Sequence, residues 1–128
     1  MKNKRKDYKD AIGWERVSAE RLERSINLNV PQNAINSLNL RRGSNEIVNW
    51  KWVVWLSHYI NGISDKEFAE KFKRDRTTLI NAKKKLQSEI DGFANYKLIE
   101  RLRLINYYAV NRIEAKKCND NEFNILTV

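Results

Sequence analysis

The residues best suited to specific chemistry lie between Lys71 and Lys85. Basic side chains dominate this stretch, and Asp75 is its only acid. Arg76, Thr77 and Thr78 follow that acid directly. A guanidinium group can pair with O6 and N7 of guanine, and a threonine methyl can contact the methyl group of thymine. The types and order of these residues therefore indicate contacts to the bases and phosphates of a nucleic acid.

Two predicted helices would position these side chains. Ser64, with Glu67 three residues later, is a capping-box pattern and predicts the start of a short helix. Asp75 is a second candidate N-cap. The helix after it carries one apolar face at helical spacing: Leu79, Ala82, Leu86 and Ile90. A short helix, a turn of about three residues and a longer helix make a helix-turn-helix, which we predict over about residues 64–90.

In such a motif the start of the second helix meets base edges while its flanks meet phosphates. Arg76 and the two threonines are the base-contacting candidates. Asn81 and Lys84, opposite or beside the apolar face, are phosphate candidates. The N–H groups of the helix that begins at Ser64 offer a further phosphate site. The competing interpretation is a solvated lysine face with threonines serving as caps; the basic character of the whole chain favours nucleic acid.

The composition sets the class of protein. A chain of 128 residues with 41% hydrophobic residues predicts one folded domain. Its formal charge of +9 favours a polyanionic partner, which is nucleic acid or, less often, an anionic membrane surface. The single cysteine, Cys118, forms no disulfide framework and suits a reducing cytoplasm. The longest apolar run, residues 52–56, is too short to span a bilayer, and the N-terminus predicts no signal peptide.

The remaining pattern predicts an all-α, compact multi-helix domain. Helices are expected at about 14–25, after Pro31, at 46–60 and at about 95–115, with an exposed basic loop at 39–45. The segment 46–60 is apolar on most faces and predicts a central helix; a strand is the competitor, but the segment is long and no hairpin signal flanks it. We predict a basic flexible tail at 1–12, the helical domain at 13–117 and a C-terminal tail at 118–128.

The stretch K-R-D-R-T-T-L-I-N-A-K-K-K also resembles the recognition signature of the DNA-binding domain of the bacterial replication initiator DnaA, within a Trp-repressor-like superfamily. S-D-K-E-F-A-E-K-F is similar to that family's preceding helix, and L-N-L-R-R-G-S-N is similar to its basic loop. The resemblance covers roughly residues 17–106. The part from Arg74 to Ala82 is fairly specific, and the rest is a similarity of pattern.

The resemblance implies roles for individual residues. Arg41 and Arg42 would enter the minor groove, and Ser44 belongs to the same loop. Asp75 and Thr77 would read bases in the adjacent major groove. The remaining matched positions would bind phosphates or support the fold: Arg74, Thr78 and Lys85.

Three departures from the family pattern predict an altered target sequence. The family's histidine before the two threonines is Arg76 here, which would favour guanine. The turn is one residue shorter and has no glycine before Lys73. The family's Arg-Gln pair near the start of the central helix falls at Trp50-Lys51, so only Lys51 keeps a charge there and counts as a candidate DNA contact.

Other functions find little support. No phosphate-binding G-x-x-x-x-G-K-[ST] sequence is present, so an ATPase module is not expected. His58 is the only histidine, and no spaced carboxylate pair or nucleophile elbow stands out, so we expect no enzyme, no metal and no cofactor.

We therefore expect a sequence-specific double-stranded DNA-binding protein of the cytoplasm. It would be a transcription regulator or a replication-origin accessory, of a size and architecture that suit a phage or mobile element. The alternative is a helical protein-interaction module or inhibitor that retains an initiator-like fold; RNA binding has only the charge in its favour. A homodimer or a partner protein could use the helix at 95–115 or an exposed face of Trp50, although Trp50 is foremost a core candidate.

Overall fold

The computed structural model describes residues 8–40, 43–92 and 96–115, which form seven α-helices and no β-strand. The prediction of an all-α fold is confirmed. The helices, in chain order, are α1 (Tyr8–Ile12), α2 (Ala19–Asn29), α3 (Gln32–Asn36), α4 (Asn45–Ile60), α5 (Asp65–Phe72), α6 (Arg76–Ile90) and α7 (Lys97–Val110). No helix within the described residues is both long and apolar enough to cross a membrane.

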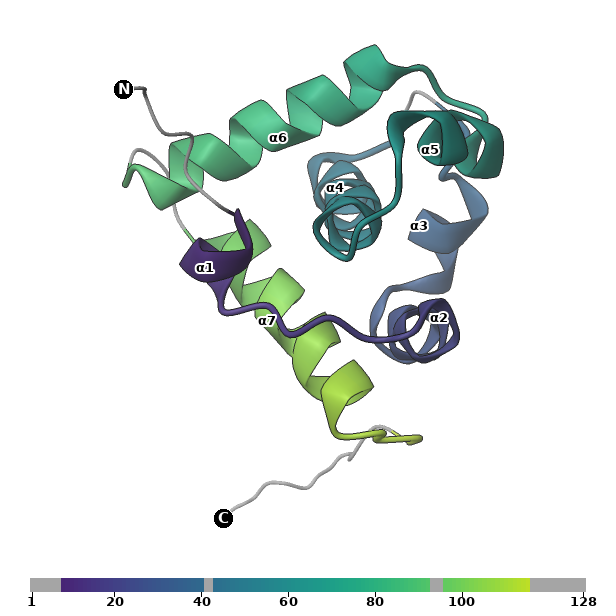
Figure 1. The fold of residues 1–128 in the computed structure, drawn as a ribbon. Helices are drawn as coiled ribbons and strands as arrows, with labels where there is room; N and C mark the ends of the chain where they lie inside the picture. Colours follow the sequence, from purple (N-terminus) through teal and green to yellow (C-terminus); the bar gives the residue numbers. More distant parts are fainter. Residues whose placement is uncertain (1–7, 41–42, 93–95, 116–128) are drawn as a thin grey trace.

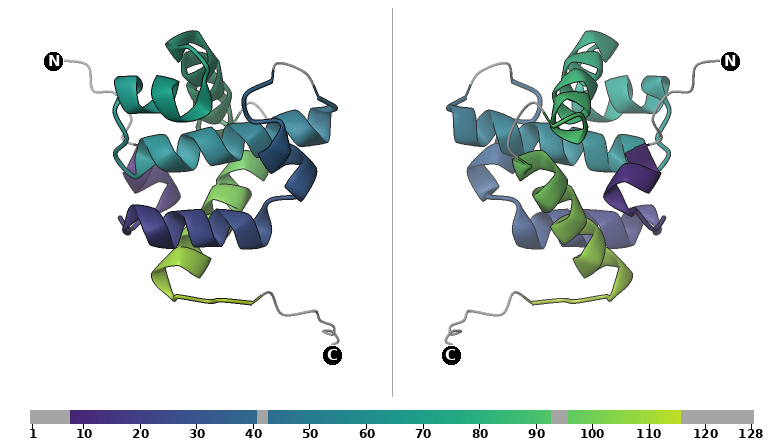
Figure 2. Two further views of the ribbon diagram at one scale, coloured as in Figure 1. Left: turned by 90° about the vertical axis from the view of Figure 1, so that its right-hand side faces the viewer. Right: turned by 90° about the vertical axis from the view of Figure 1, so that its left-hand side faces the viewer.

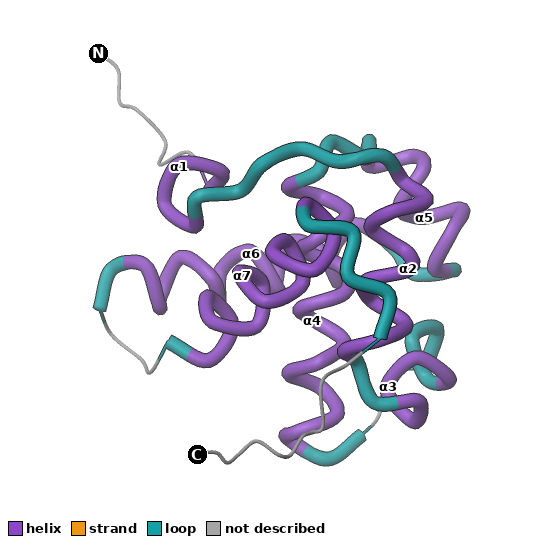
Figure 3. Tube along the Cα trace, turned by 90° about the horizontal axis from the view of Figure 1, so that it is seen from below, coloured by secondary structure: helices purple, strands orange, loops and turns teal. Residues whose placement is uncertain are grey.

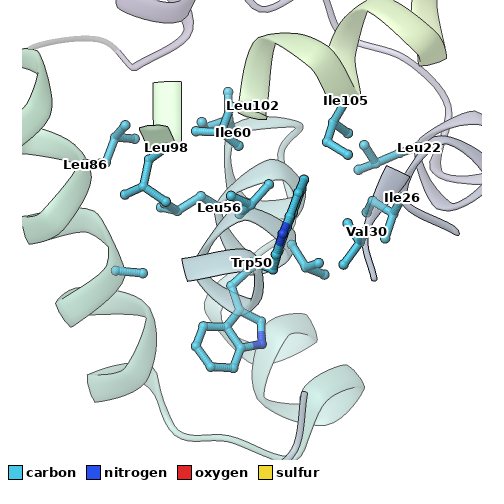
Figure 4. Close-up of a cluster of buried hydrophobic side chains, with 14 of the residues drawn as sticks. Leu22, Ile26, Val30, Trp50, Leu56, Ile60, Leu86, Leu98, Leu102 and Ile105 are labelled. Carbon is cyan, nitrogen blue, oxygen red and sulfur yellow. The ribbon is translucent and has the colours of Figure 1, made fainter. Parts of the chain in front are cut away.

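Helix α4 lies at the centre of the molecule. Figure 1 looks almost along its axis and shows α2, α3, α5, α6 and α7 arranged around it. Its side chains are buried on most faces, from Trp50 to Ile60, because each face has a neighbouring helix. Figure 4 shows Leu56 and Trp50 of α4 among side chains from α2, α6 and α7. The predicted central helix is therefore confirmed, and the strand alternative is excluded.

Helix α7 packs along α2 and α4 through its apolar face, and side chains from other helices satisfy both of its ends. Near its start, the buried carboxylate of Glu89 in α6 accepts hydrogen bonds from the backbone N–H groups of Leu98 (3.1 Å) and Ile99 (3.1 Å). At its end, Arg21 of α2 donates to the carbonyl oxygens of Ala109 (3.2 Å) and Val110 (2.8 Å). These contacts pair backbone groups that a helix leaves free at its ends, so they fix α7 against α2 and α6.

The helix predicted at 14–25 starts later than expected. Residues 14–17 are extended, and α2 begins at Ala19 because the hydroxyl of Ser18 accepts the N–H of Arg21 at 3.2 Å. Figure 3 shows the loop between α1 and α2 crossing the molecule. Trp14 is buried, but it reaches the core from this extended segment rather than from a helix.

Two distant asparagine side chains hold that extended segment. The side-chain oxygen of Asn61 accepts the indole N–H of Trp14 (3.1 Å) and the backbone N–H of Val17 (3.0 Å), and its amide nitrogen donates to the Val17 carbonyl (2.9 Å). Asn106 makes the equivalent pair of bonds with the backbone of Glu15, at 3.0 and 2.8 Å. These bonds replace those of a helix, which is why the segment stays extended.

The predicted tail and the last helix also need correction. Tyr8–Ile12 is a helix and not a tail: Ile12 is buried, and Arg103 donates to the carbonyl oxygens of Ile12 (2.9 Å) and Ala11 (3.3 Å). Helix α7 ends at Val110 and not near 115, because Arg112 adopts a left-handed backbone with φ of 54°. The C-terminal tail predicted at 118–128 lies outside the described residues.

Candidate nucleic-acid interface

The junction from α5 to α6 is built by local capping bonds. The predicted capping box at the start of α5 is present: the hydroxyl of Ser64 accepts the N–H of Glu67 at 3.1 Å, and the Glu67 carboxylate accepts the N–H of Ser64 at 3.0 Å. These bonds lower the pKa of Glu67. Lys73, with φ of 56°, ends α5 in the left-handed conformation that glycine most often adopts at the end of a helix. The shorter, glycine-free turn is therefore achieved by Lys73 itself.

Asp75 caps α6 as predicted. Its carboxylate accepts the N–H of Thr78 at 3.4 Å, so the helix begins at Arg76. Arg76 and Thr77 are exposed at this end, whereas Thr78 is half-buried. The junction presents an arginine and a threonine to solvent in the first turn of a 15-residue helix.

Helix α6 has one buried face and one exposed face. Leu79, Ala82 and Leu86 are buried against the core, as their spacing predicted, and Ile90 is half-buried at the end of the same stripe. The exposed face carries Arg76, Thr77, Ile80, Asn81 and Lys84. Both phosphate candidates, Asn81 and Lys84, therefore face solvent. Ile80, 36% exposed at the middle of this face, was not among the predicted site residues, although its place four residues after Arg76 could have identified it.

Lysines border this face on both sides, and each lies over an aromatic ring of α4. The Nζ of Lys83 lies 4.3 Å from the ring centre of Tyr59, and that of Lys85 lies 5.9 Å from the ring centre of Trp52. A cation over an aromatic face is held by the ring quadrupole, which reduces the freedom of a long side chain. Lys85 was a predicted contact. Lys83 was missed, although its position on the helix flank could be read from the same spacing.

The loop before α4 is tied to the turn before α6 through one carbonyl group. The backbone oxygen of Leu40 accepts a hydrogen bond from Nη1 of Arg74 (2.6 Å) and another from Nζ of Lys51 (2.8 Å). The Arg74 guanidinium also lies 5.4 Å from the ring centre of Trp55. Arg74 is thus a structural link between the two segments, which is one of the two roles that the resemblance implied for it.

Lys51 is not a direct phosphate contact in this structure. Its side chain is 2% exposed, and desolvation, followed by the charge of Arg74, lowers its pKa. The expectation failed because the sequence shows the charge but not the neighbours that cover it. Lys51 instead helps to hold the backbone just before Arg41 and Arg42, which lie outside the described residues.

The two serine candidates act as helix caps. The Ser44 hydroxyl accepts the N–H of Ile47 at 3.3 Å at the start of α4, while the Ser64 hydroxyl is used in the capping box. The first turn of α5 also carries two carboxylates, those of Asp65 and Glu67, which disfavour a phosphate at that end. Ser64 is therefore a poor phosphate site.

Trp50 is part of the core and offers no exposed partner face. It is 8% exposed, and the guanidinium of Arg101 lies 4.0 Å from its ring centre. Arg101 in turn pairs with Glu46 and lowers the pKa of that carboxyl. The predicted core role of Trp50 is confirmed, and its alternative role as a docking residue is wrong.

His58 is buried beside an ion pair. Its Nε2 lies 3.4 Å from Oε2 of Glu23, which also pairs with Nζ of Lys71 at 2.7 Å. Burial lowers the pKa of His58 to about 4, and the nearby Glu23 opposes that shift only in part. Within the described ranges, no cluster of three or more His, Cys, Asp or Glu is arranged to hold a metal ion.

Comparison with known proteins adds no relative from which a role could be transferred. The chain matches no protein-family model, and neither a curated protein nor a solved structure matches it.

Proposed function

We propose that this chain binds double-stranded DNA in a sequence-dependent way, with the exposed face of α6 in the major groove. The observation that carries the proposal is the composition of that face. This face brings together hydrogen-bonding, apolar and cationic side chains on one helix of a basic protein: Arg76, Thr77, Ile80, Asn81 and Lys84. An α-helix fits the major groove, and these types match the donors, acceptors and methyl groups found there.

The flanks of α6 support the same orientation. With the exposed face toward the base edges, Lys83 and Lys85 lie on opposite sides of the helix, where the phosphates of the two groove walls would be. Their positions over Tyr59 and Trp52 keep both ammonium groups close to the helix surface. Arg76 would contribute the principal base contact, worth on the order of 1–3 kcal/mol when bidentate.

The basic loop would contribute in the adjacent minor groove. The link from Arg74 to Leu40 places the backbone before Arg41 and Arg42 beside the turn that starts α6. The resemblance to the DNA-binding domain of DnaA supports this combination of a basic loop and a recognition helix. A role at a replication origin or a promoter, in the cytoplasm of a bacterium or its phage, belongs to the same proposal.

The test is selection from a randomised DNA duplex pool. We expect one enriched motif, and an affinity that falls by about 0.9 log units per contacted phosphate for each decade of salt. Arg76→Ala should relax the preference at one or two positions. The matched control is Arg24→Ala, which removes the same charge from an exposed position on α2, across α4 from α6 (Figure 1). This control should leave the motif unchanged.

Two results would count against different parts of the proposal. A pool without enrichment, together with weak salt dependence, would exclude sequence-dependent DNA binding and favour the protein-interaction alternative. An unchanged motif with Arg76→Ala would exclude only Arg76 as the base reader. The protein-interaction alternative has lost the support that an exposed Trp50 would have given it, because Trp50 is buried.

A further inference from the structure

The exposed side of α7 carries an ordered stripe that none of the described helices covers. The right-hand view of Figure 2 looks onto α7 from outside, with no other described helix in front of it. Exposed residues recur at helical spacing from the N-cap to the C-cap: Tyr96, Glu100, Arg103, Leu104, Tyr107 and Asn111. Tyr107 is 59% exposed, more than any other large hydrophobic residue described. We call these six residues the α7 stripe.

The α7 stripe is complementary to itself when two copies run antiparallel. A two-fold axis between Arg103 and Leu104 sets Glu100 opposite Tyr107, and Tyr96 opposite Asn111, so that each stripe residue meets another stripe residue. A two-fold interface uses the same patch on both subunits, with each contact made twice. In this register the Glu100 carboxylate can accept a hydrogen bond from the hydroxyl group of the opposite Tyr107.

A hollow beside the stripe can receive the tyrosine. A cavity of about 360 Å³ is lined by Ala11, Ile90, Tyr96, Ile99, Glu100 and Arg103. It borders Glu100, the position that the antiparallel register sets opposite Tyr107. The ring of Tyr107 and the hollow at Glu100 therefore lie about two helical turns apart on α7. The antiparallel two-fold register requires this separation, because it sets Tyr107 of each copy opposite Glu100 of the other.

The charges on the stripe agree with this arrangement. Arg103 directs its guanidinium to the carbonyl oxygens of Ile12 and Ala11, so its methylene groups remain to pack on the opposite Leu104. In a parallel arrangement, by contrast, Glu100 would face Glu100 and Arg103 would face Arg103. Like charges directly opposite each other are unfavourable, so antiparallel pairing is preferred.

We propose that the α7 stripe is the interface of an antiparallel homodimer of this chain. Helix α7 has 14 residues and is about 21 Å long, which is short for an interface. A contact along one such helix buries less than the roughly 800 Å² per partner of a standard interface, so we expect a weak, transient dimer. The exposed face of α6 is not used, so dimerisation does not depend on the proposed DNA binding.

Sedimentation equilibrium of the full chain without DNA, across the micromolar range and at low salt, tests the proposal. We expect a monomer–dimer equilibrium. Tyr107→Glu places a carboxylate opposite Glu100 and should raise the dimer Kd by about tenfold or more. Tyr107→Lys places a cation there and should weaken the dimer much less. The double variant with Glu100→Lys and Tyr107→Glu should recover most of the loss.

The two tyrosine variants serve as controls for each other, because they alter the same exposed position and differ in charge sign. Thermal unfolding should show both variants folded, with Tyr107→Lys slightly more stable because a cation is favoured in the last turn of a helix. A chain that is monomeric at all concentrations would overturn the proposal. Equal weakening by Tyr107→Glu and Tyr107→Lys, with no recovery in the double variant, would overturn the antiparallel register and with it the proposal.

Discussion

Arg74 donates a hydrogen bond of 2.6 Å from its guanidinium to the backbone carbonyl oxygen of Leu40. The bond joins two segments that are 34 residues apart in the chain, the turn before α6 and the connection between α3 and α4. Both segments belong to the proposed DNA-binding surface. Their relative position therefore depends in part on the Arg74 side chain.

Removing this link should affect stability and DNA binding together. For Arg74→Ala we expect the free energy of unfolding to fall by about 1–2 kcal/mol, because a charged hydrogen bond and a cation–π contact are both lost. Affinity should fall by a similar factor for all DNA sequences. Urea unfolding and binding titrations measure the two effects. The matched variant Arg76→Ala should stay within about 0.5 kcal/mol of wild type in stability while changing base preference.

The lysines on the two flanks of α6 should control the salt dependence of binding. Lys83→Gln and Lys85→Gln should each lower the slope of log K against log salt by about 0.9, because each removes one phosphate contact. The enriched DNA motif should not change. Binding isotherms at several salt concentrations give the slope. Arg24→Gln serves as the control of equal charge, and a slope that falls equally in this variant would contradict specific phosphate contacts by the flanks.

Glu89 should be important for stability, because its carboxylate caps the N-terminus of α7. It is 1% exposed and accepts the N–H groups of Leu98 and Ile99. Glu89→Ala leaves both donors buried without a partner and should cost about 3 kcal/mol. Glu89→Gln keeps one acceptor oxygen and should cost less. Glu70→Ala removes an exposed glutamate from α5 and should change the free energy of unfolding by less than about 0.5 kcal/mol in the same urea titrations.

The buried His58 should make the fold sensitive to mild acid. Its pKa is about 4 in the folded chain and about 6.5 when unfolded, so between these values the unfolded state binds more protons. The contribution of His58 to the free energy of unfolding is therefore highest above pH 6.5, and it falls as the pH drops toward 4. The total loss is about 3 kcal/mol, since each pKa unit corresponds to about 1.4 kcal/mol.

A variant that does not titrate isolates this effect from the carboxylates. Urea unfolding of the wild type and of His58→Gln should be compared at about pH 7 and about pH 4.5, where the wild type should lose about 2 kcal/mol more than the variant. Parallel losses in the two proteins would show that His58 is not the group responsible.

The elements around the candidate site could be predicted because local bonds determine them. The capping box of Ser64 and Glu67, the cap at Asp75 and the buried stripe of α6 each involve residues within about one turn of each other or on one helix face. The central position of α4 followed from its apolar residues on most faces. The exposure of Asn81 and Lys84 then followed from helical periodicity.

The corrections come from contacts between residues far apart in sequence. Trp14 and Val17 lie in an extended segment because Asn61, 44 or more residues away, takes their backbone and side-chain hydrogen bonds. Lys51 is withdrawn from the surface because Arg74, Leu40 and Trp55 meet around it. Sequence periodicity gives the face of one helix, but it does not say which residue of another element will cover it.

The sequence by itself thus determined the all-helical class, the basic charge and the order of chemical groups along α6, because these depend on composition and on bonds between near neighbours. Only the tertiary structure decided which side chains the neighbouring helices cover. It buried Lys51, set Lys83 and Lys85 over aromatic rings of α4, and left the α7 stripe uncovered. The physical reason is that burial depends on the packing of several helices at once, and no single stretch of sequence contains that information.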